Sequence, residues 1–336
     1  MAKTSSRPVI VVAGGAGYLG RCTMDILWQE GFAPVCLDNY STGHRFKSDH
    51  IPCFEVNLTD AQATRRVWEQ LPPVSGVLHF AALALVPESI KKPGLYFRNN
   101  LLCTLSLAEL AAHEQVPVIH SSSCSVYGIA QDGFIDETSP LHPISPYGES
   151  KRASENVLKQ FCSSLGLRAL NLRYFNPAGA LQSQEHGEAH EPETHLIPRT
   201  CQAALRGEPA VVYGTQYPTP DGTCIRDFLH VEDLALGHVQ ALRHVLEQPS
   251  GFFDCVNLGS GKGYSVLEVA GAIGKILGES LEIENQPPRP GDPPQLVASI
   301  EKAHRLFDWR PVKTLEDILR SHLEWEKKRE YVMKSV

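Results

Sequence analysis

A glycine-rich turn between an apolar run and a helical pattern constrains this chain more than any other feature. The run Val9–Ala13 is short and apolar, which is typical of a buried parallel strand. A helical pattern begins near Leu19 and continues over Arg21–Glu30. Glycines let a backbone approach a pyrophosphate closely, and a helix offers its first amides to that anion, so this turn predicts a dinucleotide site. The glycines fit both G-x-x-G-x-x-G and G-x-G-x-x-G, and they are Gly14, Gly15, Gly17 and Gly20.

An acidic residue follows the next predicted strand, Val35–Leu37. It is Asp38, 18 residues after Gly20. A carboxylate at this place accepts hydrogen bonds from an adenosine ribose and repels a 2′-phosphate, so the pattern favours NAD over NADP. The neighbouring Asn39 can add a hydrogen bond.

Short apolar runs alternate with helical patterns through the first half of the chain. This order predicts an α/β fold, a Rossmann-type doubly wound parallel sheet with right-handed crossovers. Further strands are predicted at Val77–Phe80, Val116–His120 and Leu167–Leu172, and helices at Leu101–Glu114 and Tyr147–Leu165.

The chain changes in character after about Pro177, where the loops become longer and richer in Gly, Pro and His. We expect residues 1–176 to form a Rossmann domain that binds NAD. Residues 177–336 are expected to form a smaller α/β region for the substrate, with some chain crossing back to the first domain. The predicted features here are helices at Leu196–Leu205, Val231–Leu246 and Val266–Leu277, a capping box at Ser265 and Glu268, a similar helix start at Thr314–Asp317, and a plain turn at Gly259–Lys262.

Two side chains with acid–base chemistry, Tyr147 and Lys151, lie four residues apart in a predicted helix. That spacing places them on one helix face, one turn from each other. An ammonium beside a phenol favours the phenolate, so we expect Lys151 to lower the pKa of Tyr147 from its usual value of about 10. A phenol with a lowered pKa is a general acid/base, and beside a dinucleotide it indicates hydride transfer at a carbon that bears a hydroxyl.

Three serines, Ser121–Ser123, end a predicted strand upstream of this pair. Open α/β sheets bind ligands at this end of their strands, and a hydroxyl there can share a substrate proton with Tyr147. Capping and turn formation are the commoner roles of clustered serines, so the sequence leaves both roles open.

Composition excludes several classes of protein. The net charge is −7 and no Lys/Arg run is present, which argues against nucleic-acid and membrane partners. The nine cysteines are scattered without a C-x-x-C pair, and the 14 histidines form no H-E-x-x-H, so we expect reduced thiols and no metal site. The N-terminal residues 1–8 lack the apolar stretch of a signal peptide, and no run reaches the length of a membrane span. A soluble cytoplasmic protein is expected.

Taken together, these motifs resemble the extended short-chain dehydrogenase/reductase family, and further stretches resemble its UDP-glucose 4-epimerase branch. The likeness runs from about residue 9 to about residue 325. Beside the motifs above, including Val126–Gly128 after the serines, the stretches that carry it are His79–Ala82, Pro87–Ser89, Asn99–Asn100, Arg173–Pro177, Tyr217–Thr223, Arg226–Val231 and Arg289–Asp292.

The resemblance implies an NAD-dependent isomerase that interconverts UDP-galactose and UDP-glucose through a 4-keto sugar. Tyr147 would take the O4 proton, Lys151 would tune it and contact the nicotinamide ribose, and Ser123 would bond to O4. The residues implied for NAD are Gly14, Gly17, Tyr18, Leu19, Gly20, Asp38, Asn39, Asn57, Leu58, Phe80, Ala81, Ala82, Asn99, Ser121, Tyr147, Lys151 and Tyr174. Those implied for the UDP-sugar are Ser123, Asn176, His195, Leu196, Tyr213, Arg226, Arg289, Asp292 and Leu296. The positive charges of Arg226 and Arg289 suit a diphosphate.

Several positions depart from the pattern of that branch. Ala84 stands where some epimerases carry a lysine near the nicotinamide, and Asn57 stands where an aspartate often meets the adenine. Ala13 replaces a frequent threonine and His195 a frequent asparagine. Leu296 lies where a bulkier tyrosine would exclude an N-acetyl group, so UDP-GlcNAc and UDP-GalNAc are further candidate substrates, although Leu296 can equally be a core residue.

Other functions remain open at this stage. A sugar-nucleotide 4,6-dehydratase would carry acidic residues after Ser123, and a UDP-glucuronate decarboxylase a carboxylate at position 125, whereas this chain has Cys124 and Ser125. A 4-epimerase for UDP-xylose, UDP-arabinose or a UDP-uronate stays open, as does a non-catalytic NAD-binding regulator. The resemblance also implies a homodimer through a four-helix interface, for which Leu101–Glu114 and Ala153–Leu165 are the candidate helices. The alternative is that these helices only cover the sheet.

Overall fold

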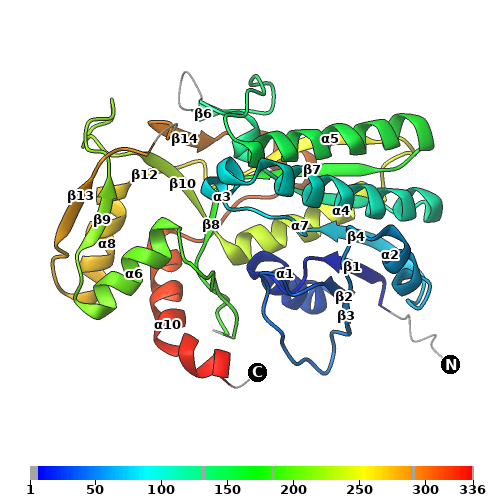
Figure 1. The fold of residues 1–336 in the computed structure, drawn as a ribbon, viewed down its shortest axis with the longest axis horizontal. Helices are drawn as coiled ribbons and strands as arrows, with labels where there is room; N and C mark the ends of the chain where they lie inside the picture. The colour runs from blue at the N-terminus through cyan, green and yellow to red at the C-terminus, as the bar shows by residue number, and fades with distance from the viewer. Residues whose placement is uncertain (1–6, 130–133, 184, 290–291, 335–336) are drawn as a thin grey trace. The chain divides into compact units, whose positions relative to one another are not determined.

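The computed structural model describes residues 7–129, 134–183, 185–289 and 292–334 (Figure 1). The chain divides into two compact units, each assembled from three stretches of sequence. The first unit is Met1–Val126, Ser145–Leu172 and Ala235–Cys255, and the second is Tyr127–Ile144, Arg173–Leu234 and Val256–Val336. The chain therefore passes between the units several times. Three elements contain a boundary: β7 (Ala169–Tyr174), α7 (Val231–Leu246) and β11 (Phe253–Leu258).

The first unit is built on a seven-stranded sheet with the order β11-β7-β5-β4-β1-β2-β3. The pairs β1–β2, β1–β4, β2–β3 and β4–β5 are parallel. This arrangement confirms the predicted Rossmann-type fold. The strands are β1 (Val9–Ala13), β2 (Ala33–Asp38), β3 (Cys53–Glu55), β4 (Val74–His79), β5 (Val118–Ser123), β7 (Ala169–Tyr174) and β11 (Phe253–Leu258).

Helices bury both faces of this sheet, which explains why its strands read as continuous apolar runs. Val11 and Val77 belong to one apolar cluster together with residues of α2, α4 and α5. On the other face, the side chains of Ile10 and Leu242 (α7) lie against Gly76. The long helices α4 and α5 lie side by side (Figure 1). The helices are α1 (Tyr18–Gln29), α2 (Ala61–Trp68), α3 (Val86–Lys91), α4 (Pro93–Glu114), α5 (Pro146–Leu165) and α7 (Val231–Leu246), with a short 3-10 turn, η1 (Cys124–Val126).

The second unit combines small sheets with a helical layer. One sheet has the order β12-β10-β14-β6, with β8 also paired to β10, and a separate pair joins β13 to β9. Helices α6, α8 and α10 share one apolar core with Phe228 of β10. The elements are β6 (Phe134–Ile135), β8 (Asn176–Ala178), α6 (Leu196–Arg206), β9 (Ala210–Tyr213), β10 (Ile225–His230), β12 (Gly263–Ser265), α8 (Val266–Leu277), β13 (Ile283–Gln286), β14 (Gln295–Ala298), α9 (Glu301–Phe307) and α10 (Leu315–Lys334).

The predicted helix starts of the C-terminal region are confirmed. Ser265 accepts a hydrogen bond from the Glu268 amide, and the Glu268 side chain accepts one from the Ser265 amide. Thr314 and Asp317 make the same reciprocal contacts before α10. Both boxes satisfy amides that a helix leaves unpaired at its first turn.

A buried carboxylate organises the larger sheet of the second unit. Asp227 on β10 is fully buried and accepts hydrogen bonds from the amides of Ser260, Gly261 and Ala298. It thereby ties β10 to β14 and to the turn at Gly259–Lys262. The Ser260 and Gly261 amides of that turn donate to the Asp227 carboxylate. This agrees with the interpretation of the segment as a plain turn.

No helix in the described ranges is both long enough and apolar enough to cross a bilayer. All nine cysteines lie in the described part of the chain, and each is a free thiol.

We predict opposite effects on stability when alanine replaces two helical glycines. At Gly20, an added Cβ would lie 2.3 Å from the Gly14 carbonyl oxygen and 2.9 Å from the Gly15 Cα, so the turn must shift. At Gly271 in α8, an added Cβ meets nothing within 4 Å, and alanine is the better helix former by up to about 1 kcal/mol. Thermal unfolding should show a lower midpoint for Gly20→Ala and an equal or higher midpoint for Gly271→Ala. A harmless Gly20→Ala would contradict the tight packing of the turn.

Candidate active site

The glycine turn has the shape that a dinucleotide requires. Gly14 has φ +77°, and an added Cβ would lie 2.5 Å from the Ala81 amide nitrogen, so only glycine fits. At Gly17, an added Cβ would meet only the Gly14 carbonyl oxygen, at 3.5 Å, which leaves the outside of the turn open. Gly17 is also the N-cap of α1 and offers no side chain to cap it. The first amides of α1 and the open turn thus fit a pyrophosphate.

Asp38 is placed at the end of β2, next to this turn. Its Oδ2 accepts from the Ala16 amide at 2.9 Å and its Oδ1 from the Tyr40 amide at 2.8 Å. Burial raises the pKa of Asp38, and the amide hydrogen bonds act in the opposite direction. A carboxylate has about four acceptor positions, so Asp38 can brace the turn and still accept from a ribose diol.

The structure gathers the other residues implied for NAD in the first unit, with one exception. The amides of Phe80 and Ala81 both donate to the Ala13 carbonyl, which fixes the end of β4 beside the glycine turn. Asn57 is exposed, and its Oδ1 already accepts from the amide and hydroxyl of Thr59. Tyr174 is the exception, because it lies beyond the boundary in β7 and belongs to the second unit. The remaining members of the set in the first unit are Tyr18, Leu19, Asn39, Leu58, Ala82, Asn99 and Ser121.

The structure brings Ser123, Tyr147 and Lys151 together at the carboxyl end of β5. Ser123 ends that strand and is hydrogen-bonded to the Tyr147 side chain. Lys151, one helical turn after Tyr147, donates from Nζ to the Ser121 carbonyl at 2.6 Å. The ring of Tyr96 lies edge-on to that of Tyr147, with centroids 6.5 Å apart. A proton acceptor, a second hydroxyl and a buried cation thus lie at the edge where an open sheet binds its ligand.

The expected effect of Lys151 on Tyr147 is not seen in the protein by itself. Burial raises the pKa of Tyr147 to about 12, the hydrogen bond from Ser123 opposes that rise, and Lys151 makes no resolved contribution. Lys151 is itself buried, which lowers its pKa to about 8. The prediction considered charge alone and left out desolvation, which disfavours the charged form of both side chains.

Sequence reasoning missed a layer of buried polar residues behind this site. Asn100 donates to Ser150 Oγ at 2.9 Å, and Ser150 donates to the Tyr147 carbonyl at 2.7 Å, so α4 holds the first turn of α5. Ser122 donates to Glu155 Oε1 at 2.6 Å, and Glu155 favours the charged form of Lys151. The members on α5 could have been found from the sequence. Their spacing predicts one helix face that carries Tyr147, Ser150, Lys151 and Glu155.

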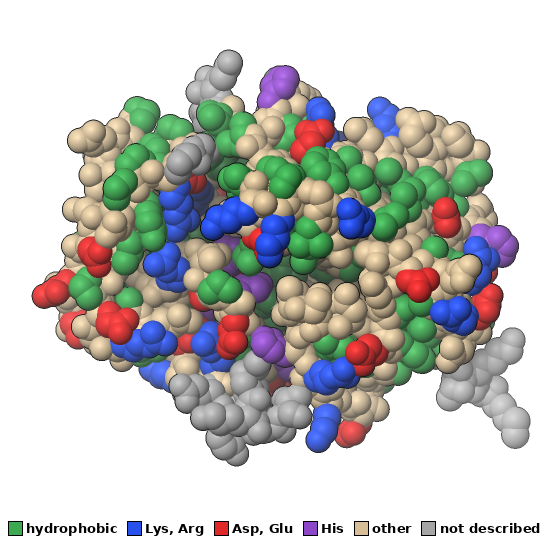
Figure 2. Space-filling model, viewed as in Figure 1, with side chains coloured by type: hydrophobic (Ala, Val, Ile, Leu, Met, Phe, Trp, Pro, Cys, Tyr) green, Lys and Arg blue, Asp and Glu red, His purple; other side chains and the backbone are tan. Residues whose placement is uncertain are grey.

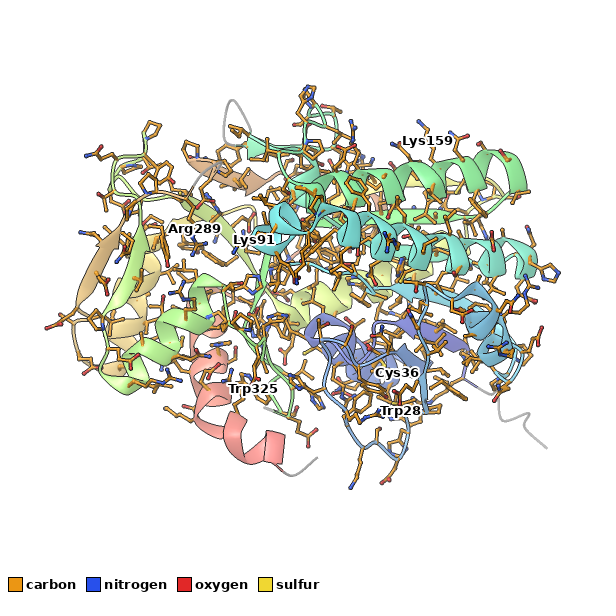
Figure 3. All side chains as sticks on the ribbon, in the orientation of Figure 1. Trp28, Cys36, Lys91, Lys159, Arg289 and Trp325 are labelled. Carbon is orange, nitrogen blue, oxygen red and sulfur yellow. The ribbon has the colours of Figure 1, made fainter. Side chains whose placement is uncertain are left out.

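In the second unit, two arginines contact the ring of Tyr213. The Arg289 guanidinium lies 4.1 Å from the ring centroid (Figure 3 labels Arg289). The Arg199 guanidinium lies 5.7 Å from the same centroid and donates a hydrogen bond to the Tyr213 hydroxyl at 3.4 Å. That hydrogen bond and the two positive charges lower the pKa of Tyr213. Arg199 was missed because nothing in the sequence separates it from an ordinary helical arginine.

The other residues implied for the UDP-sugar lie on or near β10. Arg226 forms an ion pair with Asp292, with 2.9 Å between Nη2 and Oδ1, and it pairs in register with Leu296 on β14. Asn176 on β8 donates to the Asp227 carbonyl at 2.9 Å. The centre of the motif Arg289–Asp292, residues 290 and 291, lies outside the described residues. His195 and Leu196 stand at the start of α6.

The fold and these two groups of residues define a nucleotide-binding α/β protein with a Ser–Tyr–Lys set at the carboxyl end of β5. The profile of the NAD dependent epimerase/dehydratase family matches residues 10–259, and the chain belongs to that family. A UDP-glucose 4-epimerase of Azospirillum brasilense is 40% identical over 332 residues, covering 98% of this chain and 94% of the relative.

Solved structures give the same answer. The structure of UDP-glucose 4-epimerase from Brucella ovis in complex with NAD matches with a TM-score of 0.88 and 40% identity, covering 94% of this chain and 97% of that one. The enzyme from Bifidobacterium longum in complex with NAD+ and UDP matches with a TM-score of 0.89 and 34% identity, covering 96% of this chain and 99% of that one.

We predict that Lys151 costs stability at neutral pH and that this cost disappears at alkaline pH. Its folded pKa of about 8 lies below the ordinary value of 10.5, so the unfolded chain holds one more proton between these values. Stability therefore rises with pH in this window, by at most about 3 kcal/mol. The thermal midpoint of wild type minus that of Lys151→Met should increase from pH 8 to pH 10.5. A constant difference would contradict a buried, desolvated lysine.

Proposed function

We propose that this chain is an NAD-dependent UDP-hexose 4-epimerase that interconverts UDP-galactose and UDP-glucose. The observation that carries the proposal is the set Ser123, Tyr147 and Lys151 at the end of β5, in the same unit as the open glycine turn and Asp38. Membership of the NAD dependent epimerase/dehydratase family supports it. The first unit, including the helix of Tyr147 and Lys151, would bind NAD. The second would bind the sugar nucleotide, apart from the contacts of Ser123.

In this proposal the residues of α5 and β5 handle the proton. When bound, NAD would supply the hydride acceptor and donor that the oxidation and reduction of C4 require. Tyr147 takes the O4 proton and gives it back, and Ser123 holds O4 within reach through its hydroxyl. The raised pKa of Tyr147 means that it is protonated near neutral pH in the chain alone. Positive charge beside the phenol, from Lys151 or from the nicotinamide ring of the oxidised cofactor, would lower that pKa.

The second unit would supply the anchor for UDP. Arg226, Arg289 and the missed Arg199 offer guanidinium donors that suit a diphosphate, and Tyr213 offers an aromatic face. Asp292 can accept from a ribose hydroxyl in addition to its pairing with Arg226. Most of the binding energy would thus come from the UDP part of the substrate, which does not react. The sugar would then be free to rotate within the site.

The size of the sugar pocket decides which UDP-sugars react. Leu296 is half-buried on β14 and is smaller than a tyrosine at this place would be. A solved relative from Campylobacter jejuni, 34% identical, is described as a UDP-Glc/GlcNAc 4-epimerase. We therefore extend the proposal to UDP-GlcNAc and UDP-GalNAc as second substrates. The free thiols support a place in a reducing compartment, the cytoplasm.

We predict that purified protein converts UDP-galactose to a fixed mixture with UDP-glucose without added NAD. Tyr147→Phe should lower turnover by about 10²–10⁴-fold, because it removes the proton acceptor, while bound NAD and the thermal midpoint stay unchanged. The two sugar nucleotides are separated by chromatography, starting from either one. Full activity in Tyr147→Phe would exclude the assigned role. Conversion of a UDP-pentose but of no UDP-hexose would correct the substrate, and no conversion at all would leave a non-catalytic NAD-binding protein.

We further propose a homodimer formed through α4 and α5 of each subunit. Leu95 and Leu102 lie seven residues apart on α4, and their side chains are 44% and 37% exposed. Figure 2 shows hydrophobic side chains gathered over this part of the molecule. Exposed apolar side chains on one face of α4, beside α5, are typical of a surface that a partner covers.

We predict that Leu102→Glu converts the dimer into monomers, because it places charge in an apolar interface. Val312→Glu is the matched control, since Val312 is 75% exposed and belongs to the second unit, whereas α4 and α5 belong to the first. Size-exclusion chromatography with light scattering should give about twice the chain mass for wild type and control, and the chain mass for Leu102→Glu. A monomeric wild type would show that these helices only cover the sheet.

A further inference from the structure

Four ionisable side chains meet in the segment that leads into α6. They are Glu188, His190, Glu193 and His195, and one nitrogen or carboxylate oxygen from each lies within 4.8 Å of the others. The carboxylates are buried, with only 3% of the Glu188 side chain and 6% of the Glu193 side chain exposed. Two buried carboxylates need hydrogen-bond donors or positive charge beside them, and two imidazoles lie within reach.

Glu188 is the centre of this cluster. Its Oε1 pairs with Nδ1 of both His195 and His190, the latter at 3.0 Å. The backbone of Glu188 is held as well, because Trp325 donates from Nε1 to its carbonyl at 2.7 Å (Figure 3 labels Trp325). The indole of Trp325 is buried and packs against Gly187, where an added Cβ would lie 2.6 Å from the ring. The carboxylate of Glu188 therefore has a rigid support in the core.

Glu193 holds the start of α6. Its Oε1 accepts from the amides of Thr194 at 2.7 Å and of His195 at 2.9 Å, and it lies 3.4 Å from His195 Nδ1. His195 is the N-cap of α6 and gives that helix no side-chain cap. Glu193 thus fixes the backbone and, together with Glu188, the ring of His195.

The result is a histidine whose orientation and charge are both set by its neighbours. Partial desolvation lowers the pKa of His195, but the two carboxylates beside Nδ1 outweigh it and raise the value to about 10, which favours the imidazolium at neutral pH. Because Nδ1 is engaged, Nε2 is the nitrogen left for a ligand. The side chain is 53% exposed, so the opposite edge of the ring is accessible.

We propose that Glu188 and Glu193 are positioning residues that hold His195 as a cation, with Nε2 offered to the UDP part of the substrate. This inference rests on the proposed function, which places a UDP-sugar at His195. It explains why a histidine can replace an asparagine there, since a charge-assisted donor is the stronger partner for an anion. Glu188 and Glu193 act only through His195 and do not contact the substrate.

A metal ion is the competing explanation of the same four side chains. Ligands bound tetrahedrally to zinc at 2.0–2.2 Å are separated by roughly 3.3 Å. The contact between Glu188 Oε1 and His195 Nδ1 is shorter than this and has the length of a hydrogen bond, so a shared proton accounts for it. The geometry therefore favours a hydrogen-bonded ion pair over a metal site.

The test is a double-mutant cycle on the NAD-bound protein, with UDP as the probe of binding. Glu188→Gln should raise the Kd for UDP and the KM for UDP-galactose about tenfold or more, while kcat stays within about threefold. His195→Ala should have a similar effect. If Glu188 acts through His195, the double variant should bind UDP no more weakly than His195→Ala alone. Glu185→Gln is the matched control, because Glu185 is an exposed carboxylate in the same segment, and its Kd should not change.

Several results would overturn the inference. They are a Glu188→Gln variant that binds UDP like wild type, additive losses in the double variant, and losses in kcat without a change in Kd. Loss of UDP binding after dialysis against a chelator, restored by zinc, would replace it with a metal site. If wild type binds UDP and the cycle shows that Glu188 acts through His195, but wild type has no epimerase activity, the proposed reaction is overturned and this inference is supported. A wild type that does not bind UDP would overturn both.

Discussion

The parallel sheet of the first unit is the constraint on which the rest of the site depends. Parallel strands joined by right-handed crossovers bring all their carboxyl ends to one edge. The glycine turn follows β1, Asp38 ends β2 and Ser123 ends β5, so three distant stretches of sequence reach this edge together. Helix α5 then adds Tyr147 and Lys151 beside Ser123. The site exists because the topology places these ends together, and no loop of unusual length is needed.

Burial sets the chemistry of that edge, and it does so at a cost in stability. Lys151 and Tyr147 both sit where water is largely excluded, which lowers the pKa of one and raises that of the other. Each shift favours the neutral form, whereas proton transfer needs a phenolate beside an ammonium. A polar layer of Ser150, Asn100 and Glu155 compensates in part and holds α5 in place. The first unit thus keeps a pair of side chains whose charged forms are disfavoured by burial.

The second unit uses buried carboxylates as structural centres. Asp227 gathers amides from the Ser260 turn and from β14, and Glu193 gathers amides at the start of α6. In both places one carboxylate accepts hydrogen bonds from backbone amides that an irregular segment would otherwise leave unpaired. The difference is that Asp227 stabilises a turn, whereas Glu188 and Glu193 also fix a cation on the surface. We therefore interpret the first as a fold element and the others as part of the binding site.

Local patterns in the sequence were enough to identify the Rossmann unit and to single out the candidate residues of its site. The run Val9–Ala13, the glycine spacing and Asp38 each follow from backbone geometry and the chemistry of a dinucleotide, and they need no knowledge of distant contacts. Helices such as Val231–Leu246 and Val266–Leu277 were predicted to the residue because periodicity and caps are local signals. The short strands β3, β6, β8, β9, β12, β13 and β14 were not predicted, since strands of two to four residues carry no period of their own. The six-residue strands β10 and β11 were missed as well.

Tertiary structure alone decided which charges are paired and which side chains lose their water. The pKa of Tyr147 depends on burial by Tyr96 and its neighbours, which the Y-x-x-x-K spacing does not contain. Arg199 reaches Tyr213 only after α6 packs beside β9, and the support of Glu188 by Trp325 joins residues 137 positions apart. Sequence determined the backbone frame of the site because turns, caps and periods are local. The fold decided its electrostatics, because desolvation and ion pairing depend on groups that meet only once the chain has folded.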